Sequence, residues 1–378
     1  MRTPGCRCTL FFLVRRLLAC HNTGSMIRQL TLEGITLFPS AQCFSFEPGI
    51  NVLIGGNDSG KSHLMKLGYA LCKWSSGSTR KELPAVWAEE KRLRLILMRV
   101  FGLRDLTELT SRFAAPCTAT VHASMVGEKV PPGSAELVFS FRSGAEEEGL
   151  HISTMPERYL NSNSIYLAAR EVLSVYPCYT QIGRRYPELL DSAGWDLCTA
   201  LEQEPTAEPE HALLPIIRRI EALLRGRMLR RHDRFYLHRP GQEPTELNLV
   251  AEGFKRIGTL GLLLANGSVR RGTTLFWDEP EMNLNTSHLP ALVDILLALC
   301  HAGVQLVLST HSLFLLRELA IRLSEAKHRA LSRRYFGLQP GEHGTTVCAA
   351  DELEALDRLD SLDAEAAQAD RYLRMEQP

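Results

Sequence analysis

The feature that most constrains the fold is a glycine-rich motif at residues 55–62. These residues read GGNDSGKS and fit G-x-x-x-x-G-K-[ST] at every fixed position. Residues 49–56 form a short apolar run that ends in glycines, and residues 61–73 place apolar side chains near a 3.6-residue period. The sequence therefore predicts a strand, a glycine loop and a helix in that order, which is the context in which this motif holds phosphate.

The residues of this loop have distinct predicted roles in binding ATP. Backbone N–H groups at the start of a helix favour an anion, so we expect them to surround the β-phosphate. Lys61 is expected to reach the β- and γ-phosphates, and the Ser62 hydroxyl is expected to bind Mg²⁺. The predicted nucleotide-binding residues are Gly55, Gly56, Asn57, Asp58, Ser59, Gly60, Lys61 and Ser62.

Two adjacent carboxylates follow a second apolar run. Residues 274–281 read TLFWDEPE, so Asp278 and Glu279 come at the end of a predicted strand, where an open α/β sheet binds its ligands. Asp278 is the expected partner of Mg²⁺, directly or through water. On an extended backbone Glu279 would point the other way, and we expect it to orient or deprotonate the attacking water.

A histidine ends the next predicted strand. Residues 307–312 read VLSTHS, with a predicted helix between this strand and the carboxylates. A neutral imidazole at His311 could hydrogen-bond the γ-phosphate or the attacking water and report hydrolysis to the following helix.

The net charge and the cysteine content limit which binding partners and which cellular compartment are expected. Lysine plus arginine and aspartate plus glutamate number 43 each, so any nucleic-acid contact must come from a local patch. The ten cysteines form no C-x-x-C pair, which favours reduced thiols in the cytoplasm. No segment is long and apolar enough to span a bilayer, and no membrane partner is expected. Residues 1–25 are interpreted as a tail or a start assigned too early, because a strand pattern begins at Met26.

The chain divides into five predicted segments. Residues 1–25 are the tail, 26–160 contain the phosphate loop and a β-rich lobe, and 161–245 form a helical insert. Residues 246–350 restore strand and helix alternation, with helices at 251–265, 287–302 and 313–324. Residues 351–378 are expected to form a C-terminal helix that docks on the core rather than recruiting a partner.

The order of these motifs resembles the ABC-type ATPase heads of the SMC, RecF and OLD-like group, especially the short AAA-labelled bacterial ATPases related to OLD proteins. The resemblance covers residues 26–75 and 245–325. It implies an α/β P-loop head with a mixed sheet, a β-rich N-terminal lobe and a helical insert. It also implies Mg²⁺ and ATP as cofactors and a homodimer in which two heads enclose the nucleotide.

In this family a signature segment of one head completes the other head's site. The corresponding residues begin a predicted helix after Leu249, and Ala251 stands where a serine usually meets the γ-phosphate. Lys255 or Arg256 could substitute for that contact, and an ordinary helix start is the alternative. The segment comprises Ala251, Glu252, Gly253, Lys255 and Arg256. Asn283 matches the region that crosses the dimer interface, and Arg170 with Glu171 is the nearest counterpart of the family's Q-loop.

The resemblance implies an ATPase that drives or gates a protein effector, such as a nuclease encoded nearby. Too few residues follow the predicted helix at 313–324 for a nuclease domain within this chain. Bacterial anti-phage defence and DNA maintenance are both compatible settings. The alternatives are a RecF-type DNA-repair protein and, less favoured, a transporter's ATP-binding subunit.

A run of arginines in the predicted insert leaves two interpretations open. Such a cluster can contact nucleic-acid phosphates, but few aromatic side chains accompany it. A solvated helix face or a protein contact is the alternative. The arginines are Arg218, Arg219, Arg225, Arg227, Arg230, Arg231 and Arg234.

Overall fold

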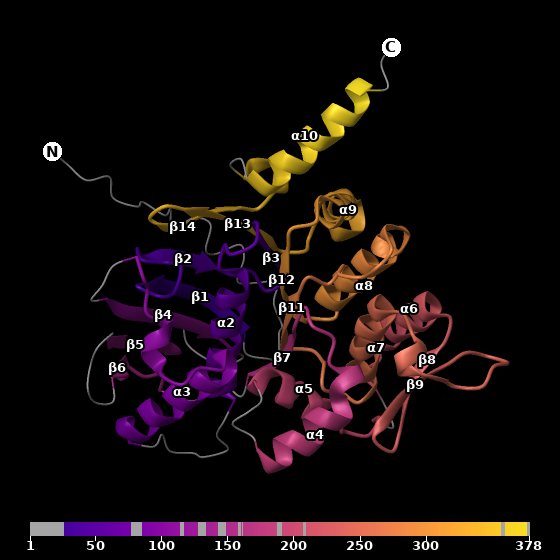
Figure 1. Ribbon diagram of the computed structural model, residues 1–378, viewed down its shortest axis with the longest axis horizontal. Helices are drawn as coiled ribbons and strands as arrows, with labels where there is room; N and C mark the ends of the chain where they lie inside the picture. Colours follow the sequence, from indigo (N-terminus) through magenta and orange to yellow (C-terminus); the bar gives the residue numbers. More distant parts are fainter. Residues whose placement is uncertain are drawn as a thin grey trace.

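The fold is built around a six-stranded sheet whose strands come from both halves of the chain (Figure 1). Its order is β14 (Gly344–Ala350), β13 (Arg333–Gly341), β3 (Ile50–Ile54), β12 (Gln305–Thr310), β11 (Thr273–Asp278) and β7 (Asn163–Leu167). The strands from β13 to β7 run parallel, and β14 is antiparallel to β13. The mixed sheet expected from the sequence is therefore confirmed. The carboxyl ends of β3, β11 and β12 meet at one edge, so the loops that follow them lie together.

The structure is a computed structural model, and it describes residues 26–76, 85–113, 117–127, 134–142, 149–157, 160, 162–186, 191–206, 209–356 and 360–375. The predicted N-terminal tail at 1–25 lies outside the described residues.

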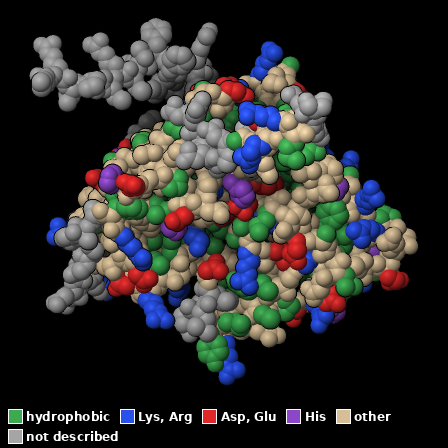
Figure 2. All heavy atoms as spheres, turned by 45° about the horizontal axis from the view of Figure 1, so that its top comes forward, with side chains coloured by type: hydrophobic (Ala, Val, Ile, Leu, Met, Phe, Trp, Pro, Cys, Tyr) green, Lys and Arg blue, Asp and Glu red, His purple; other side chains and the backbone are tan. Residues whose placement is uncertain are grey.

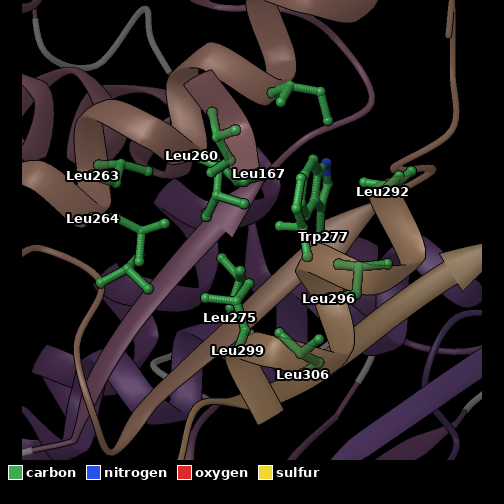
Figure 3. Packing of buried hydrophobic residues seen from close by; sticks show 14 of the residues in the cluster. Leu167, Leu260, Leu263, Leu264, Leu275, Trp277, Leu292, Leu296, Leu299 and Leu306 are labelled. Carbon is green, nitrogen blue, oxygen red and sulfur yellow. The ribbon is translucent and has the colours of Figure 1, made fainter. Parts of the chain in front are cut away.

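The central strands are buried on both faces. In β11, Leu275 and Trp277 pack into one hydrophobic cluster, whereas Phe276 between them packs into a second. Figure 3 shows the first cluster, in which Trp277 lies beside Leu292 and Leu296. A strand covered on both sides reads as a continuous apolar run, which is why β3 and β11 could be recognised in the sequence.

An antiparallel five-stranded sheet forms the N-terminal lobe, in agreement with the expected β-rich region. Its order is β2 (Gln42–Ser45), β1 (Met26–Glu33), β4 (Thr118–Val126), β5 (Glu136–Arg142) and β6 (His151–Thr154). Helix α2 (Lys61–Ser75) contacts β1 of this lobe and strands β7, β11 and β12 of the core sheet. Helix α3 (Val86–Phe101) packs on α2 and is followed by the short helix η1 (Leu106–Leu109).

The middle segment, residues 161–245, is only partly helical, so the prediction of a helical insert needs correction. It contains helices α4 (Tyr176–Arg185), α5 (Ser192–Leu201) and α6 (Leu214–Leu224). It also contains β7, the edge strand of the core sheet, and a separate three-stranded sheet of β8 (Arg227–Arg231), β9 (Arg234–His238) and β10 (Thr245–Glu246). In β9, Phe235 and Leu237 are buried while the residues beside them are not, and this two-residue period selects a strand.

Helices α7 (Glu252–Ala265), α8 (Leu289–His301) and α9 (Leu313–Ser324) contribute buried side chains to the first cluster, close to their predicted bounds. The hairpin of β13 and β14 was missed in the sequence, although it extends the core sheet beyond β3. None of the described helices is long and apolar enough to cross a membrane.

The C-terminal helix α10 (Asp360–Met375) begins later than expected and extends away from β13 and β14 (Figure 1). Tyr372, Leu373 and Met375 are exposed, so the prediction that this end of the chain docks on the core is wrong for these residues. The helix is rich in alanine and acidic residues, which leaves it few large apolar groups to bury.

Candidate active site

The glycine loop forms the predicted turn between β3 and α2. Asp58 has a φ of 59° and Gly60, the residue before the helix, has a φ of 93°. Gly60 also lies against Phe38, where a Cβ would come within 2.8 Å of the ring. The start of α2 has no side-chain cap, so its first N–H groups are available to an anion.

Lys61 folds back over the loop that precedes it. Its Nζ donates to the carbonyl oxygens of Gly55 at 2.8 Å and Gly56 at 2.7 Å. Burial lowers the pKa of Lys61, and the carboxylates that oppose this shift are Asp278, Glu279 and Glu281. The lysine is therefore close enough to the carboxylates at the end of β11 for their charges to affect it, as expected if the glycine loop and these carboxylates form one site.

Asp278 is the centre of the carboxylate cluster. Ser62 Oγ donates to its Oδ2 at 3.0 Å, and the Ser309 hydroxyl donates to Oδ1. The Tyr166 hydroxyl lies 3.5 Å from Oδ2, and burial raises the pKa of this tyrosine well above its usual value. The structure thus brings together the two side chains predicted to hold Mg²⁺.

Glu279 differs from its prediction in the conformation of its backbone. Its φ is 48°, in the left-handed region, rather than extended. Its N–H donates to the Ser309 carbonyl at 3.0 Å, and its side chain turns toward His311. The expected separation from Asp278 is therefore produced by a left-handed residue rather than by strand alternation.

His311 and Glu279 form a pair at the ends of neighbouring strands. His311 Nδ1 lies 3.0 Å from Glu279 Oε1, and the two side chains are 49% and 20% exposed. Because a carboxylate accepts, Nδ1 carries the proton, and Nε2 of a neutral ring is then an acceptor. This tautomer suits a contact with a water hydrogen, whereas a bond to a phosphate oxygen would need the doubly protonated ring.

Glu281 is a carboxylate whose role the sequence did not suggest. Thr310 Oγ1 donates to its Oε1, and its Oε2 is buried without a hydrogen-bond partner. Burial raises the pKa of Glu281, and the hydrogen bond from Thr310 partly opposes this shift by lowering the pKa. The sequence indicates a third carboxylate at this site only through the position of Glu281, three residues after Asp278.

The predicted signature segment forms the first turn of α7, with Ala251 as the residue before the helix and no side-chain cap. Gly253 packs against the backbone of Asn283, so these two separately predicted residues touch. Asn283 itself has a left-handed φ of 60°. Leu249, just before this turn, is 82% exposed.

Lys255 and Arg256 do not have the role proposed for them. Both are buried, with exposures of 3% and 5%. Lys255 Nζ donates to Ser174 Oγ at 3.0 Å and Glu252 Oε1 at 2.6 Å. Arg256 donates to the backbone carbonyls of Asp278 and Glu279. Neither cation can replace a serine on a second head, because α7 turns this side toward its own core.

The nearest counterpart of a Q-loop follows β7. Arg170 is exposed, and the Glu171 carboxylate accepts from the N–H groups of Leu173 and Ser174. Ala168, two residues earlier, accepts a hydrogen bond from Arg256 at 3.3 Å. The segment therefore lies beside the site, but its part in binding nucleotide stays a prediction.

The arginine-rich run lies partly on the β8–β9 hairpin rather than on one helix face. Arg230 pairs with Glu204 at 2.6 Å and Arg234 pairs with Glu246 at 2.5 Å, which reduces the charge available to phosphates. On the face in Figure 2, basic and acidic side chains are interspersed.

Comparison with known proteins bears on the fold. A family model described as "AAA domain, putative AbiEii toxin, Type IV TA system" matches residues 184–317, which include α7, β11 and His311 but not the glycine loop. No curated protein matches the chain.

The solved structures that resemble the chain include an Smc head with an extended coiled coil, bound to the C-terminal domain of ScpA, derived from Pyrococcus furiosus. It has a TM-score of 0.50 and 13% identity, and the match covers 93% of this chain and 100% of that one. An SmcHead bound to the C-winged helix domain of ScpA has a TM-score of 0.51 and 13% identity, with 87% and 99% covered. The chain has the fold of an SMC head. The resemblance to ABC-type P-loop heads noted in the sequence is thus confirmed for the fold.

Proposed function

We propose that this chain is an ATPase that binds Mg·ATP and pairs head to head around the nucleotide. The observation that carries the proposal is the convergence of four side chains beside one phosphate loop. Ser62 meets Asp278 at 3.0 Å, and Glu279 meets His311 at 3.0 Å, from the loop and the ends of β11 and β12. One pair suits the metal of a nucleotide, and the other suits the attacking water.

The reaction that fits this geometry is the attack of water on the γ-phosphorus of ATP. The water oxygen forms a bond to phosphorus while the bond to the β,γ-bridging oxygen breaks, and ADP leaves with that electron pair. Glu279 accepts the proton of the water and passes it to solvent, and His311 Nε2 holds the second hydrogen of the water. Lys61 exchanges its carbonyl partners for phosphate oxygens when ATP binds.

The residues present fit Mg²⁺. The 3.0 Å between Ser62 Oγ and Asp278 Oδ2 equals the spacing of about 3 Å between adjacent ligands of an octahedral ion bound at about 2.1 Å. Both ligands are oxygens, as this ion prefers. When bound, Mg²⁺ would neutralise charge on the β- and γ-phosphate oxygens.

The first test compares the wild type with Glu279→Gln, which keeps the shape of the side chain but cannot accept a proton. We expect the variant to bind ATP, to lose at least about 100-fold in turnover, and to accumulate as an ATP-dependent dimer in sedimentation. Glu342→Gln, at an exposed position in the β13–β14 turn, is the matched control and should behave as the wild type.

Two results would contradict the proposal. One is a wild type that neither binds nor hydrolyses ATP with Mg²⁺. The other is a Glu279→Gln variant that turns over at the wild-type rate, because the attacking water would then be activated elsewhere.

We infer that the output of head pairing is delivered to a protein effector, such as a nuclease encoded nearby, in anti-phage defence or DNA maintenance. Two solved heads of similar fold are bound to domains of ScpA, and this supports the proposal that this chain also has a protein partner. No disulfide links the cysteines that the structure describes, and four of them are buried thiols, as in a cytoplasmic protein. Cleavage of DNA or RNA by the purified chain alone would argue against a separate effector.

A further inference from the structure

Arg256 joins the start of α7 to the residues that carry the proposed chemistry. Its Nη1 donates to the Glu279 carbonyl at 2.5 Å, and its Nη2 donates to the carbonyls of Asp278 at 2.5 Å and Ala168 at 3.3 Å. The side chain is 5% exposed, and burial lowers the pKa of the guanidinium. The carboxylates of Glu281 and Asp278 oppose this shift, so the charge is compensated at a distance while its hydrogen bonds go to backbone carbonyls. The guanidinium therefore holds the backbone after β11 in place rather than pairing with one acidic side chain.

The peptide that Arg256 holds has an unusual conformation. Glu279 is not glycine, yet its φ of 48° places it in the left-handed region. This conformation costs a non-glycine residue free energy and persists only where the surrounding structure imposes it. The Ser309 carbonyl accepts the N–H on one side of the residue, and Arg256 binds the carbonyl on the other. The direction of the Glu279 side chain toward His311 therefore depends on both contacts.

A second contact couples the same helix to the same loop. Gly253, one turn before Arg256, lies so close to Asn283 that a Cβ would come within 2.5 Å of its carbonyl oxygen. The first turn of α7 thus touches the chain before and after Pro280. Because a helix turn moves as a rigid unit, a displacement of its exposed N-terminus would move the Glu279 peptide.

We propose that Arg256 is a positioning residue that transmits contact by a second copy of this chain, at the exposed start of α7, to the carboxylate of Glu279. This inference rests on the proposed function and extends it. Pairing of heads would then control hydrolysis by setting the Glu279 backbone, in addition to any contact that the partner makes with ATP.

The guanidinium is suited to this task because it is planar and presents five N–H donors in a fixed fork. A lysine keeps the charge but cannot hold successive carbonyls in that geometry. We therefore expect Arg256→Lys to keep a KM for ATP close to that of the wild type, since it leaves the glycine loop intact. Its kcat should fall about 10- to 100-fold, the effect of misplacing a reacting group by about 1 Å.

The test measures kcat, KM and the dependence of rate per head on protein concentration. The wild type should become faster per head as dimers form. Arg256→Lys should remain slow at every concentration, although its combination with Glu279→Gln should still form the ATP-dependent dimer. Thr259→Val is the matched control, because Thr259 is also buried on α7 but donates only to a carbonyl of its own helix.

Loss of folding is separated from loss of positioning by the melting temperature and by Arg256→Gln, which keeps a planar donor group. Wild-type kcat in either folded Arg256 variant would overturn the inference while the proposed function stands. A rate loss that follows melting temperature equally in Arg256→Lys and Thr259→Val would overturn it as well. A wild type without turnover or ATP-dependent pairing would overturn both proposals.

Discussion

Replacing Gly253 by alanine tests the close approach between α7 and the loop after β11. A Cβ at this position would lie 2.5 Å from the Asn283 carbonyl oxygen and 3.0 Å from Leu284 Cα, both backbone atoms that cannot rotate away. An ordinary contact begins near 3.4 Å, so the helix and the loop must separate by about 0.9 Å. Gly261→Ala is the control on the same helix, because its Cβ would meet only Ile220 Cγ2 at 3.1 Å.

The two substitutions should differ in their effect on the free energy of unfolding. Alanine is favoured over glycine inside a helix by about 1 kcal/mol, and at Gly261 the 3.1 Å contact with Ile220 Cγ2 offsets part of this gain. At Gly253, in the first turn, the gain is smaller and overpacking costs about 1–3 kcal/mol. We expect Gly253→Ala to lower the free energy of unfolding by about 1–2 kcal/mol and Gly261→Ala to leave it equal or slightly higher.

Thermal unfolding followed by circular dichroism measures the difference. Unfolding entropy is about 2.1 cal/mol/K per residue, so a change of 1 kcal/mol shifts the melting temperature of this 378-residue chain by about 1 °C. Gly253→Ala should therefore melt about 1–3 °C below Gly261→Ala. Turnover should also fall in Gly253→Ala, because the loop carries Glu279. Equal melting temperatures for the two variants would refute the packing described for the start of α7.

Two further predictions concern pH. Burial raises the pKa of Glu281, so the folded chain binds this proton more tightly than the unfolded chain, and stability should fall as pH rises above the ordinary value of 4.5. Glutamine at this position does not titrate, so the melting temperature of Glu281→Gln should rise relative to that of the wild type between about pH 4.5 and pH 8. A difference in melting temperature that does not change with pH would show that the pKa of Glu281 is not raised in the folded chain. The rings of His301 and His328 lie 2.9 Å apart, nitrogen to nitrogen, and burial lowers the pKa of both, so stability should fall as pH drops below 6.5. His301→Gln should flatten that loss in thermal melts between about pH 5 and pH 7, and an unchanged slope would show that the pair does not control it.

The parts of the site that could be predicted from the sequence are those in which a short motif fixes its own geometry. The glycine loop needs only a strand before it and a helix after it, and both were recognisable from their periodicity. Asp278 and His311 could be placed because parallel strands deliver their carboxyl ends to one edge of a sheet. The contact between Ser62 and Asp278, and the position of His311 beside them, follow from that topology.

The remaining parts depend on packing that a local pattern does not contain. Lys255 and Arg256 are polar residues at the start of a helix, and only the position of α7 against β11 turns them inward. The left-handed backbone conformation at residue 279 could not be predicted, because the residue there is glutamate and not glycine. Strand β7 cannot be separated from the expected helical insert by its local pattern, because its partner β11 lies more than 100 residues away in the chain.

The strand order of the core sheet has a consequence for how the chain is made. Strand β3 consists of five buried residues, and both of its partners, β12 and β13, are about 250 to 280 residues further along the chain. At about 5–20 residues per second, a ribosome needs about 15–60 s to supply them. During that time the strand that carries the glycine loop has apolar surface and unpaired backbone groups on both edges. Pairing of the strand that carries the glycine loop therefore cannot be completed until the C-terminal strands have emerged.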